Sequence, residues 1–259
     1  MVGKLVVVSS EREQRLVFGE VAEQYDAFRP TYPDAVFDTI IEYGNLRPGD
    51  RALEIGAGTG KATMKMAARG LDVTALEPSP EMAAVLRSKG IDPIETTFES
   101  WRLERAAFRL AYAAQAWHWV HGEDRYERVV SALAPGGVVA LFWNQGGEWD
   151  GALGEANDAV YERHAPHLTR AVRQWNLDVL LEELSATPGF SAAEKRTVTW
   201  SQSYTRGEWE SLLGTHSDHR ILPEEQRQRL HAAVGDVIDA HGGRVEVTYD
   251  VNIYLARRQ

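Results

Sequence analysis

A short apolar run leads into the residues most able to do chemistry, Glu54-Ile55-Gly56-Ala57-Gly58-Thr59-Gly60. Glycines at this point let a chain turn sharply after a strand and let its backbone approach a ligand closely. Free N–H groups at the start of the following helix add polar contacts and the positive end of the helix dipole. Glycine stands at every second position of this loop, which differs from the G-x-G-x-x-G pattern of dinucleotide-binding loops. The pattern therefore predicts a ligand-binding loop, and an ordinary strand-to-helix turn is the alternative.

Two carboxylates indicate what the loop would bind. Glu54 precedes the first glycine by two residues, where it would repel a pyrophosphate but suit a ligand ammonium group, directly or through water. Glu77 follows the apolar run 72–76, and an acid there can accept hydrogen bonds from both ribose hydroxyls. The alternative for Glu77 is a solvated charge at a strand end. Together the two acids favour a ligand with a ribose and an amino group over a nicotinamide dinucleotide.

The histidines supply one candidate base. His118 follows a predicted strand, near the edge where such sheets bind ligands, and imidazole is a common general base. A histidine held by a backbone group is the alternative. Three pairs have an i, i+3 spacing compatible with metal binding: His118/His121, His164/His167 and His216/His219. Since neither a carboxylate partner pattern nor an H-E-x-x-H motif accompanies them, we expect no metal site.

Alternating strands and helices must position these residues. Strands are predicted over 51–55, 72–76, 93–96, 110–114, 138–143, 197–203 and 244–256. Helices are predicted over 17–44, with a break at Pro30 and Pro33, and over 61–69, 79–89, 122–133, 151–168 and 175–184. The alternation indicates an α/β, Rossmann-like sheet of seven strands, with helices on both faces and a helical insertion between the fifth and sixth strands. We expect one domain over 1–259, with an N-terminal helical segment at 11–44 and a helical cover over the ligand edge at about 150–190.

Composition excludes several classes of protein. The chain has no cysteine, which rules out disulfides, thiolate metal sites and a cysteine nucleophile. The net charge of −10 argues against a general nucleic-acid surface, which needs a basic face. The apolar run at 5–8 is too short for a signal-peptide core or a membrane span. We therefore expect a soluble, cytoplasmic protein that binds neither nucleic acid nor membrane.

At these motifs the sequence resembles the class I S-adenosylmethionine-dependent methyltransferases over nearly its whole length. Glu54 to Gly60 is similar to the first motif of that superfamily, and Glu77-Pro78-Ser79-Pro80-Glu81-Met82 is similar to the second. Two further segments resemble the trans-aconitate-methyltransferase-like, or methyltransferase type 11, group: Tyr25-Asp26-Ala27-Phe28-Arg29-Pro30-Thr31-Tyr32-Pro33 and Ala114-Gln115-Ala116-Trp117-His118-Trp119. One departure is Arg109, where the family often has an acid.

The resemblance implies that S-adenosylmethionine is the cofactor and assigns roles around it. The glycine loop would pass under the methionine and ribose, and Glu77 would hold the ribose. Other residues would lie near the adenine, contact the cofactor after the fourth strand, or close the site from the N-terminal helices. The full set implied to bind the cofactor is Tyr25, Arg29, Glu54, Gly56, Ala57, Gly58, Glu77, Pro78, Met82, Thr97, Phe98 and Gln115.

The expected function is methyl transfer to a small molecule at a carboxylate, a hydroxyl or a ring carbon, with His118 as the candidate base. A neutral hydroxyl needs a base, whereas an ionised acceptor does not. The alternatives are a protein that binds S-adenosylmethionine without catalysis and a nicotinamide-dependent oxidoreductase. The sequence leaves open the identity of the acceptor and the oligomeric state.

Overall fold

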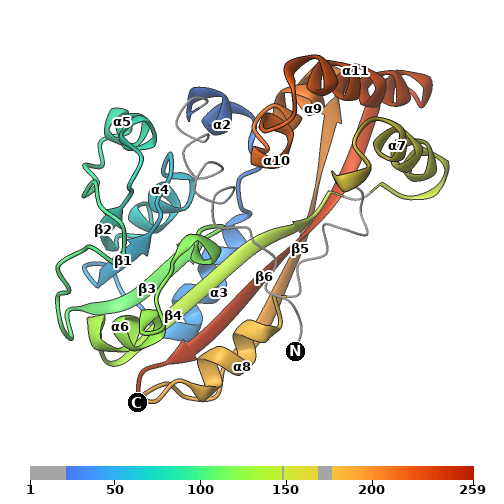
Figure 1. Ribbon diagram of the computed structural model, residues 1–259. Helices are drawn as coiled ribbons and strands as arrows, with labels where there is room; N and C mark the ends of the chain where they lie inside the picture. Colours follow the sequence, from blue (N-terminus) through green and yellow to red (C-terminus); the bar gives the residue numbers. More distant parts are fainter. Residues whose placement is uncertain (1–21, 148, 169–176) are drawn as a thin grey trace. The chain divides into compact units, whose positions relative to one another are not determined.

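The computed structural model describes residues 22–147, 149–168 and 177–259 (Figure 1). The contacts within the chain divide it into two compact units. The sheet unit consists of Pro30–Gly147, Trp175–Ser201 and Thr248–Gln259, and the helical unit of Met1–Arg29, Glu148–Gln174 and Gln202–Val247. The single domain expected over 1–259 stays a prediction.

Within the described residues, the sheet has six strands in the order β2-β1-β3-β4-β6-β5. Their bounds are β1 Arg51–Ile55, β2 Asp72–Leu76, β3 Phe108–Ala114, β4 Leu133–Gly146, β5 Glu194–Thr205 and β6 Arg244–Arg257. β1 pairs in parallel with β2 and β3, and β3 pairs in parallel with β4, whereas β6 is antiparallel to β4. Four strands therefore point their carboxyl ends at the same edge. In open α/β sheets this is the edge that binds ligands, and it carries the glycine loop, Glu77 and Gln115.

The prediction of a seventh strand over 93–96 is wrong. Only Ile94 pairs with the sheet there, in a single parallel bridge to Leu76. Pro93 has no N–H to offer a neighbouring strand. The N–H of Thr96 bonds back to the main-chain oxygen of Ile94 at 2.9 Å, so the chain turns away at once. The α/β, Rossmann-like class itself is confirmed, with six strands in place of seven.

Helices pack on both faces of the sheet, as predicted. Those of the sheet unit are α3 Asp34–Gly44, α4 Lys61–Ala67, α5 Pro80–Ser88, α6 Arg125–Ala132 and α8 Val179–Ala186, with a 3-10 turn, η2, at Trp117–Trp119. Successive side chains of β3 point to opposite faces. Leu110 and Tyr112 join α3 and α4 in one core cluster, while Ala111 and Ala113 join α6 and α8 in another.

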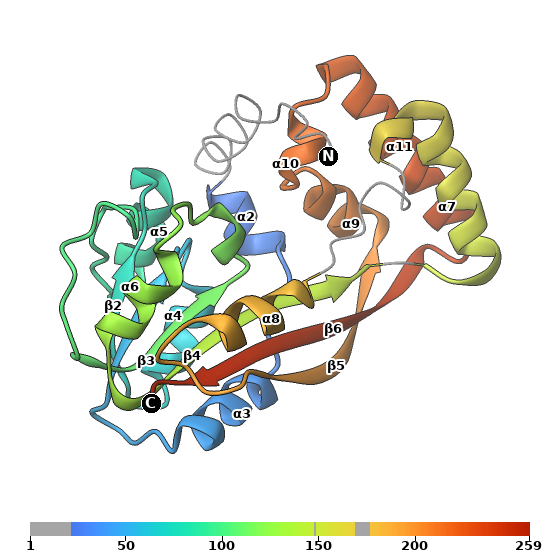
Figure 2. The same ribbon diagram turned by 60° about the horizontal axis from the view of Figure 1, so that its bottom comes forward.

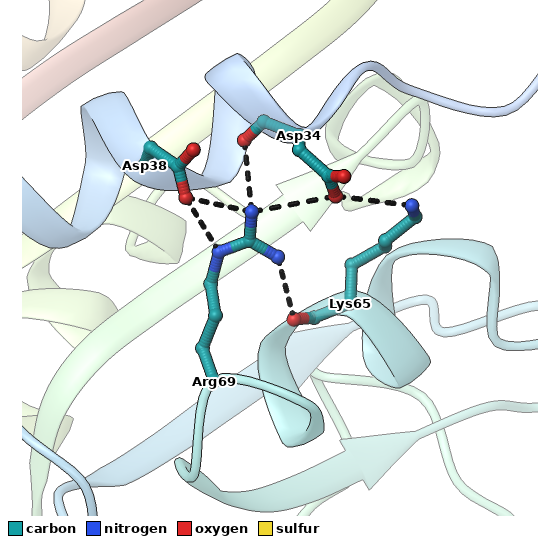
Figure 3. Close-up of polar contacts among 4 residues, drawn as sticks. All are labelled: Asp34, Asp38, Lys65 and Arg69. Carbon is teal, nitrogen blue, oxygen red and sulfur yellow. Dashed lines mark hydrogen bonds and ion pairs between the residues drawn. The ribbon is translucent and has the colours of Figure 1, made fainter.

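Ion pairs at the surface connect α4 to α3 (Figure 3). Arg69, just beyond the end of α4, donates from Nε to Asp38 Oδ1 at 2.8 Å and from Nη2 to the main-chain oxygen of Asp34 at 3.0 Å. Lys65 Nζ donates to Asp34 Oδ1 at 3.0 Å. Because both aspartates are largely exposed, each pair contributes at most about 1 kcal/mol. Their geometric effect is to fix the helix whose first residues follow the glycine loop.

The helical unit is built from segments far apart in the sequence. They are α2 Ala22–Phe28, α7 Gly151–His164, the 3-10 turn η3 Pro166–Leu168, α9 Arg206–Leu213, α10 Ser217–Arg220 and α11 Glu224–Ala240. α7 lies alongside α11 (Figure 1, Figure 2). Arg29 Nη2 donates to the main-chain oxygen of Thr215 at 3.0 Å, which ties the end of α2 to the turn after α9. The sequence patterns predict a helix over 151–168 but none over 206–240, where α9, α10 and α11 lie.

Two predicted segments extend beyond the described residues. Of the N-terminal segment 11–44, residues 11–21 lie outside them, and the rest forms α2 and α3. Of the cover at about 150–190, residues 169–176 lie outside them, α7 belongs to the helical unit and α8 to the sheet unit. Leu180 and Leu184 of α8 are buried in the same cluster as α6, so α8 flanks a sheet face. The cover over the ligand edge stays a prediction. Among the described residues, no helix has the length and apolar character needed to cross a membrane.

Candidate functional site

The glycine loop has a backbone that other residues would adopt only under strain. Gly56 and Gly58 have φ angles of +73° and +57°, in the left-handed region that favours glycine. A Cβ on Gly56 would lie 2.6 Å from the Cβ of Ala116, so the loop also approaches the end of β3 closely. A Cβ on Gly58 would meet no described atom within 4 Å. Gly58 therefore borders open space at the ligand edge, where a ligand could pass over the backbone.

Glu54 is buried at the base of this loop, with 1% of its surface exposed. Its Oε2 accepts hydrogen bonds from the hydroxyls of Thr63 at 2.5 Å and Tyr112 at 2.9 Å. Its other oxygen, Oε1, is buried without a hydrogen-bond partner among the described residues. Burial raises the pKa of the Glu54 carboxyl to about 8, because a charge is costly away from water. A cationic ligand group would supply both the missing partner and the compensating charge.

Glu77 is also buried, with 6% of its surface exposed. Its Oε2 accepts from the N–H of Gly58 at 2.7 Å, and its Oε1 accepts from the N–H of Ser79 at 2.8 Å. The carboxylate thus connects the end of β2 to the glycine loop. The alternative of a solvated strand-end charge is wrong, because two backbone donors hold this carboxylate in place.

Gln115 follows β3 at the same edge in a strained conformation. Its φ of +56° is unusual for a residue with a side chain and costs about 1–2 kcal/mol. Two contacts with β4 hold it there: its N–H bonds to the oxygen of Phe142 at 2.9 Å, and its Nε2 bonds to the oxygen of Asn144 at 3.2 Å. Strain of this kind collects at ligand sites, where the surrounding structure enforces it.

Comparison with known proteins shows which family the chain belongs to. A family model described as a methyltransferase domain matches residues 52–137. An uncharacterized methyltransferase of Mycobacterium tuberculosis is 37% identical over 234 residues, covering 90% of this chain and 89% of the relative. The chain belongs to the class I S-adenosylmethionine-dependent methyltransferases. The trans-aconitate-like subgroup stays a prediction.

Solved structures agree with the fold of a methyltransferase. A protein of Anaeromyxobacter dehalogenans described as a type II methyltransferase superposes with a TM-score of 0.62 at 20% identity, covering 89% of this chain and 98% of that one. Phosphoethanolamine N-methyltransferase 2 of Haemonchus contortus, bound to phosphomonomethylethanolamine and S-adenosylhomocysteine, superposes with a TM-score of 0.54 at 17% identity. That match covers 99% of this chain and 61% of that chain. S-adenosylmethionine is the cofactor of this family of methyltransferases, to which the chain belongs.

The residues at the ligand edge of the methyltransferase fit that cofactor. S-adenosylmethionine carries an ammonium group, a ribose and an adenine. The buried, unpartnered oxygen of Glu54 suits the ammonium group, and the open space beside Gly58 leaves room for the ligand. Thr63 and Tyr112, which orient Glu54, were not singled out from the sequence. Nothing in the pattern separates them from other residues of a helix and a strand.

The residues expected near the adenine lie around this edge with different burial. Pro78 and Thr97 are half-buried, whereas Met82 and Phe98 are buried. Phe98 stacks on Trp101, with ring centroids 6.4 Å apart, within the core cluster of α6 and α8. Their contacts with the cofactor stay predictions.

Three further residues expected in the site of the methyltransferase are His118, Tyr25 and Arg29. His118 accepts a hydrogen bond from Trp143 Nε1 at its Nδ1, over 3.3 Å, and burial lowers the pKa of its ring to about 4. It is thus neutral at pH 7 but a weak base, and its catalytic role stays a prediction. Tyr25 and Arg29 belong to the helical unit, where the Arg29 guanidinium lies 5.3 Å from the centre of the Tyr25 ring. Their closure of the site also stays a prediction.

Proposed function

We propose that this methyltransferase acts on a small molecule, with a carboxylate, a hydroxyl or a ring carbon as the acceptor. The net charge of −10 supports a small acceptor over a nucleic acid, whose phosphates bind best to a basic face. The methyltransferase of Haemonchus contortus was crystallised with phosphomonomethylethanolamine, so this fold accommodates small acceptors.

The observation that carries the proposal for the cofactor site is the unpartnered Oε1 of Glu54. When bound, S-adenosylmethionine supplies a methyl group already activated by its sulfonium, so the acceptor displaces the sulfur directly. The chain's own contribution is orientation, which can supply on the order of 7–11 kcal/mol of the barrier. Glu54 would hold the ammonium group and Glu77 the ribose, and the open space beside Gly58 would admit the ligand.

The low pKa of His118 favours some acceptors over others. A ring whose pKa is about 4 is a weak base, so it gives little help in removing the proton of a neutral alcohol at pH 7. Acceptors that arrive ionised, such as carboxylates, need no base. We therefore propose carboxylates as the preferred class, with acidic hydroxyls and enolised ring carbons next.

The test is turnover of methyl-labelled S-adenosylmethionine with a panel of carboxylates, phenols and alcohols, and with RNA as a separate arm. We expect label in a small carboxylate and equal formation of S-adenosylhomocysteine. Gly58→Val serves as the control with a blocked cofactor site and should transfer no label. Label found only in RNA would refute a small acceptor. Tight S-adenosylhomocysteine binding without turnover on any arm would instead identify a non-catalytic binding protein.

A further inference from the structure

Three potential metal ligands meet in the helical unit, away from the glycine loop in the sequence. His216, Asp218 and His219 each offer one donor atom, and these atoms all lie within 4.8 Å of one another. His216 is the residue that precedes α10, and the other two lie within that helix. His216 and Asp218 are half-buried, whereas His219 is completely buried. The cluster therefore has one side in the protein interior and one side toward solvent.

Two further side chains hold the buried member of this cluster. His219 Nδ1 lies 3.0 Å from His231 Nε2, which comes from α11. His219 Nε2 lies 3.3 Å from the hydroxyl of Tyr161, which comes from α7. Each ring nitrogen of His219 thus has a hydrogen-bonding partner. Whichever nitrogen binds a ligand, the other keeps a hydrogen bond that fixes the orientation of the ring.

We propose that His216, Asp218 and His219 form a binding site for a divalent transition-metal ion, with Zn²⁺ as the best match to the donor set. Two imidazoles and a carboxylate are a common protein ligand set for Zn²⁺, and water completes the tetrahedron. A histidine that binds metal almost always has its second nitrogen held by another group. When one nitrogen of His219 binds the ion, its present hydrogen bond is given up. The residue that stays bonded to the other nitrogen, either His231 or Tyr161, is then the positioning residue.

The three donor atoms need to move only a short distance toward one another to bind a single ion. Ligands about 2.1 Å from a tetrahedral Zn²⁺ lie about 3.4 Å from one another. The present limit of 4.8 Å shrinks to that value if each donor atom moves by less than about 1 Å. Because the chain has no cysteine, no thiolate competes for the ion.

The sequence alone predicts no metal site at His216 and His219. Their i, i+3 spacing is visible in it, but no carboxylate pattern of the H-E-x-x-H kind accompanies them. Asp218 lies between them in the chain, and α10 brings its carboxylate to the same side. A search for the H-E-x-x-H spacing on one helix does not detect this combination of two histidines and an aspartate.

The experiment is calorimetric titration of the full chain, without a polyhistidine tag and after chelator treatment, with Zn²⁺. We expect one ion per chain. The variants His216→Ala and Asp218→Asn should each bind about ten-fold more weakly or worse. Because only one partner of His219 keeps its hydrogen bond, one of His231→Ala and Tyr161→Phe should weaken binding by about ten-fold. Substitution of Co²⁺ should give the visible absorption of a tetrahedral nitrogen and oxygen site.

His241→Ala is the matched control, because His241 is exposed in the same unit and its Nδ1 bonds to the main-chain oxygen of Val237, four residues away. It should bind Zn²⁺ like the unmodified chain. Circular dichroism confirms that each variant is folded before it is titrated. The proposal is overturned if the unmodified chain binds no Zn²⁺ up to about 1 mM. It is also overturned if folded His216→Ala and Asp218→Asn bind as tightly as His241→Ala.

Discussion

At the scale of single residues, the buried Oε1 of Glu54 is a polar atom that a bound ligand would satisfy. An unpartnered buried polar atom costs about 1–3 kcal/mol, and Glu54 has one while its other oxygen accepts two hydroxyl donors. The carboxyl avoids part of this cost by holding a proton, since burial raises its pKa to about 8. A bound ammonium group would make the charged form favourable again.

This linkage predicts how cofactor affinity depends on pH. With no ligand bound, the raised pKa of Glu54 stabilises the fold at pH values below 4.5, and this stability is lost as the pH rises to about 8. If the bound form is ionised, binding releases a proton, so S-adenosylhomocysteine should bind more tightly as the pH rises from about 6 to about 8, by up to about ten-fold per unit. Titration calorimetry in two buffers of different ionisation enthalpy measures the proton directly. Glu54→Gln should bind weakly with no such slope, and an equally flat slope in the unmodified protein would contradict the assignment.

Glu77 should affect both affinity and stability. Glu77→Ala removes the acceptor for the N–H groups of Gly58 and Ser79, so the unliganded protein should lose about 1–3 kcal/mol of unfolding free energy. Loss of the ribose contacts should also weaken S-adenosylhomocysteine binding about ten-fold or more. Calorimetry of unfolding and of binding gives both values.

A destabilised control separates the two effects of Glu77. Thr205 caps α9 in the helical unit, and Thr205→Ala should cost about 1 kcal/mol through loss of that cap. If Thr205→Ala keeps its affinity while Glu77→Ala loses it, the ribose role stands. Equal affinities in the two folded variants would make Glu77 purely structural.

At the scale of elements, the bounds of β1 and β2 were predictable, whereas the local conformations at the ends of the strands were not. The bounds predicted for β1 and β2, 51–55 and 72–76, match the structure because apolar runs between a turn and a polar loop define short parallel strands. The bridge at Ile94 and the left-handed Gln115 depend on hydrogen bonds to neighbouring strands, which no local pattern encodes. The helices over 206–240 were missed although local signals were present. Thr205 and Glu208 form a capping box at the start of α9, and Leu230, Val234 and Ile238 are buried at helical spacing in α11.

The strain at the end of β3 gives a prediction at this scale. Gln115→Gly should relieve the positive φ and stabilise the protein by about 1 kcal/mol, less the loss of the bond to Asn144. If Gln115 contacts the cofactor, affinity for S-adenosylhomocysteine should fall at the same time. Ala106 has a φ of +50° before β3 begins, so Ala106→Gly is the matched control. It should gain stability with unchanged affinity, and the assignment of Gln115 fails if the two variants behave alike in binding.

At the scale of the whole molecule, the division into two units determines which part of the chain a bound ligand contacts and stabilises directly. The glycine loop, Glu54, Glu77 and Gln115 all belong to the sheet unit, whereas the proposed metal ligands belong to the helical unit. Each unit gathers segments from several parts of the chain, and β5 and β6 both begin in one unit and end in the other. Because these strands are shared, we expect the units to unfold together in one transition.

S-adenosylhomocysteine should therefore raise the melting temperature of the whole chain. A ligand that binds only the folded state at 100 times its Kd adds about 2.7 kcal/mol. For a chain of this size each kcal/mol shifts the melting temperature by about 2–4 °C, so the expected rise is about 5–10 °C. Differential scanning calorimetry would show one peak that moves with ligand. Gly58→Val should melt in one transition too, but with no shift, because its side chain would occupy the open space beside the loop. Two separate peaks, of which only one moves with ligand, would show that the shared strands do not couple the units. A peak that moves equally in Gly58→Val would place the ligand elsewhere than the glycine loop.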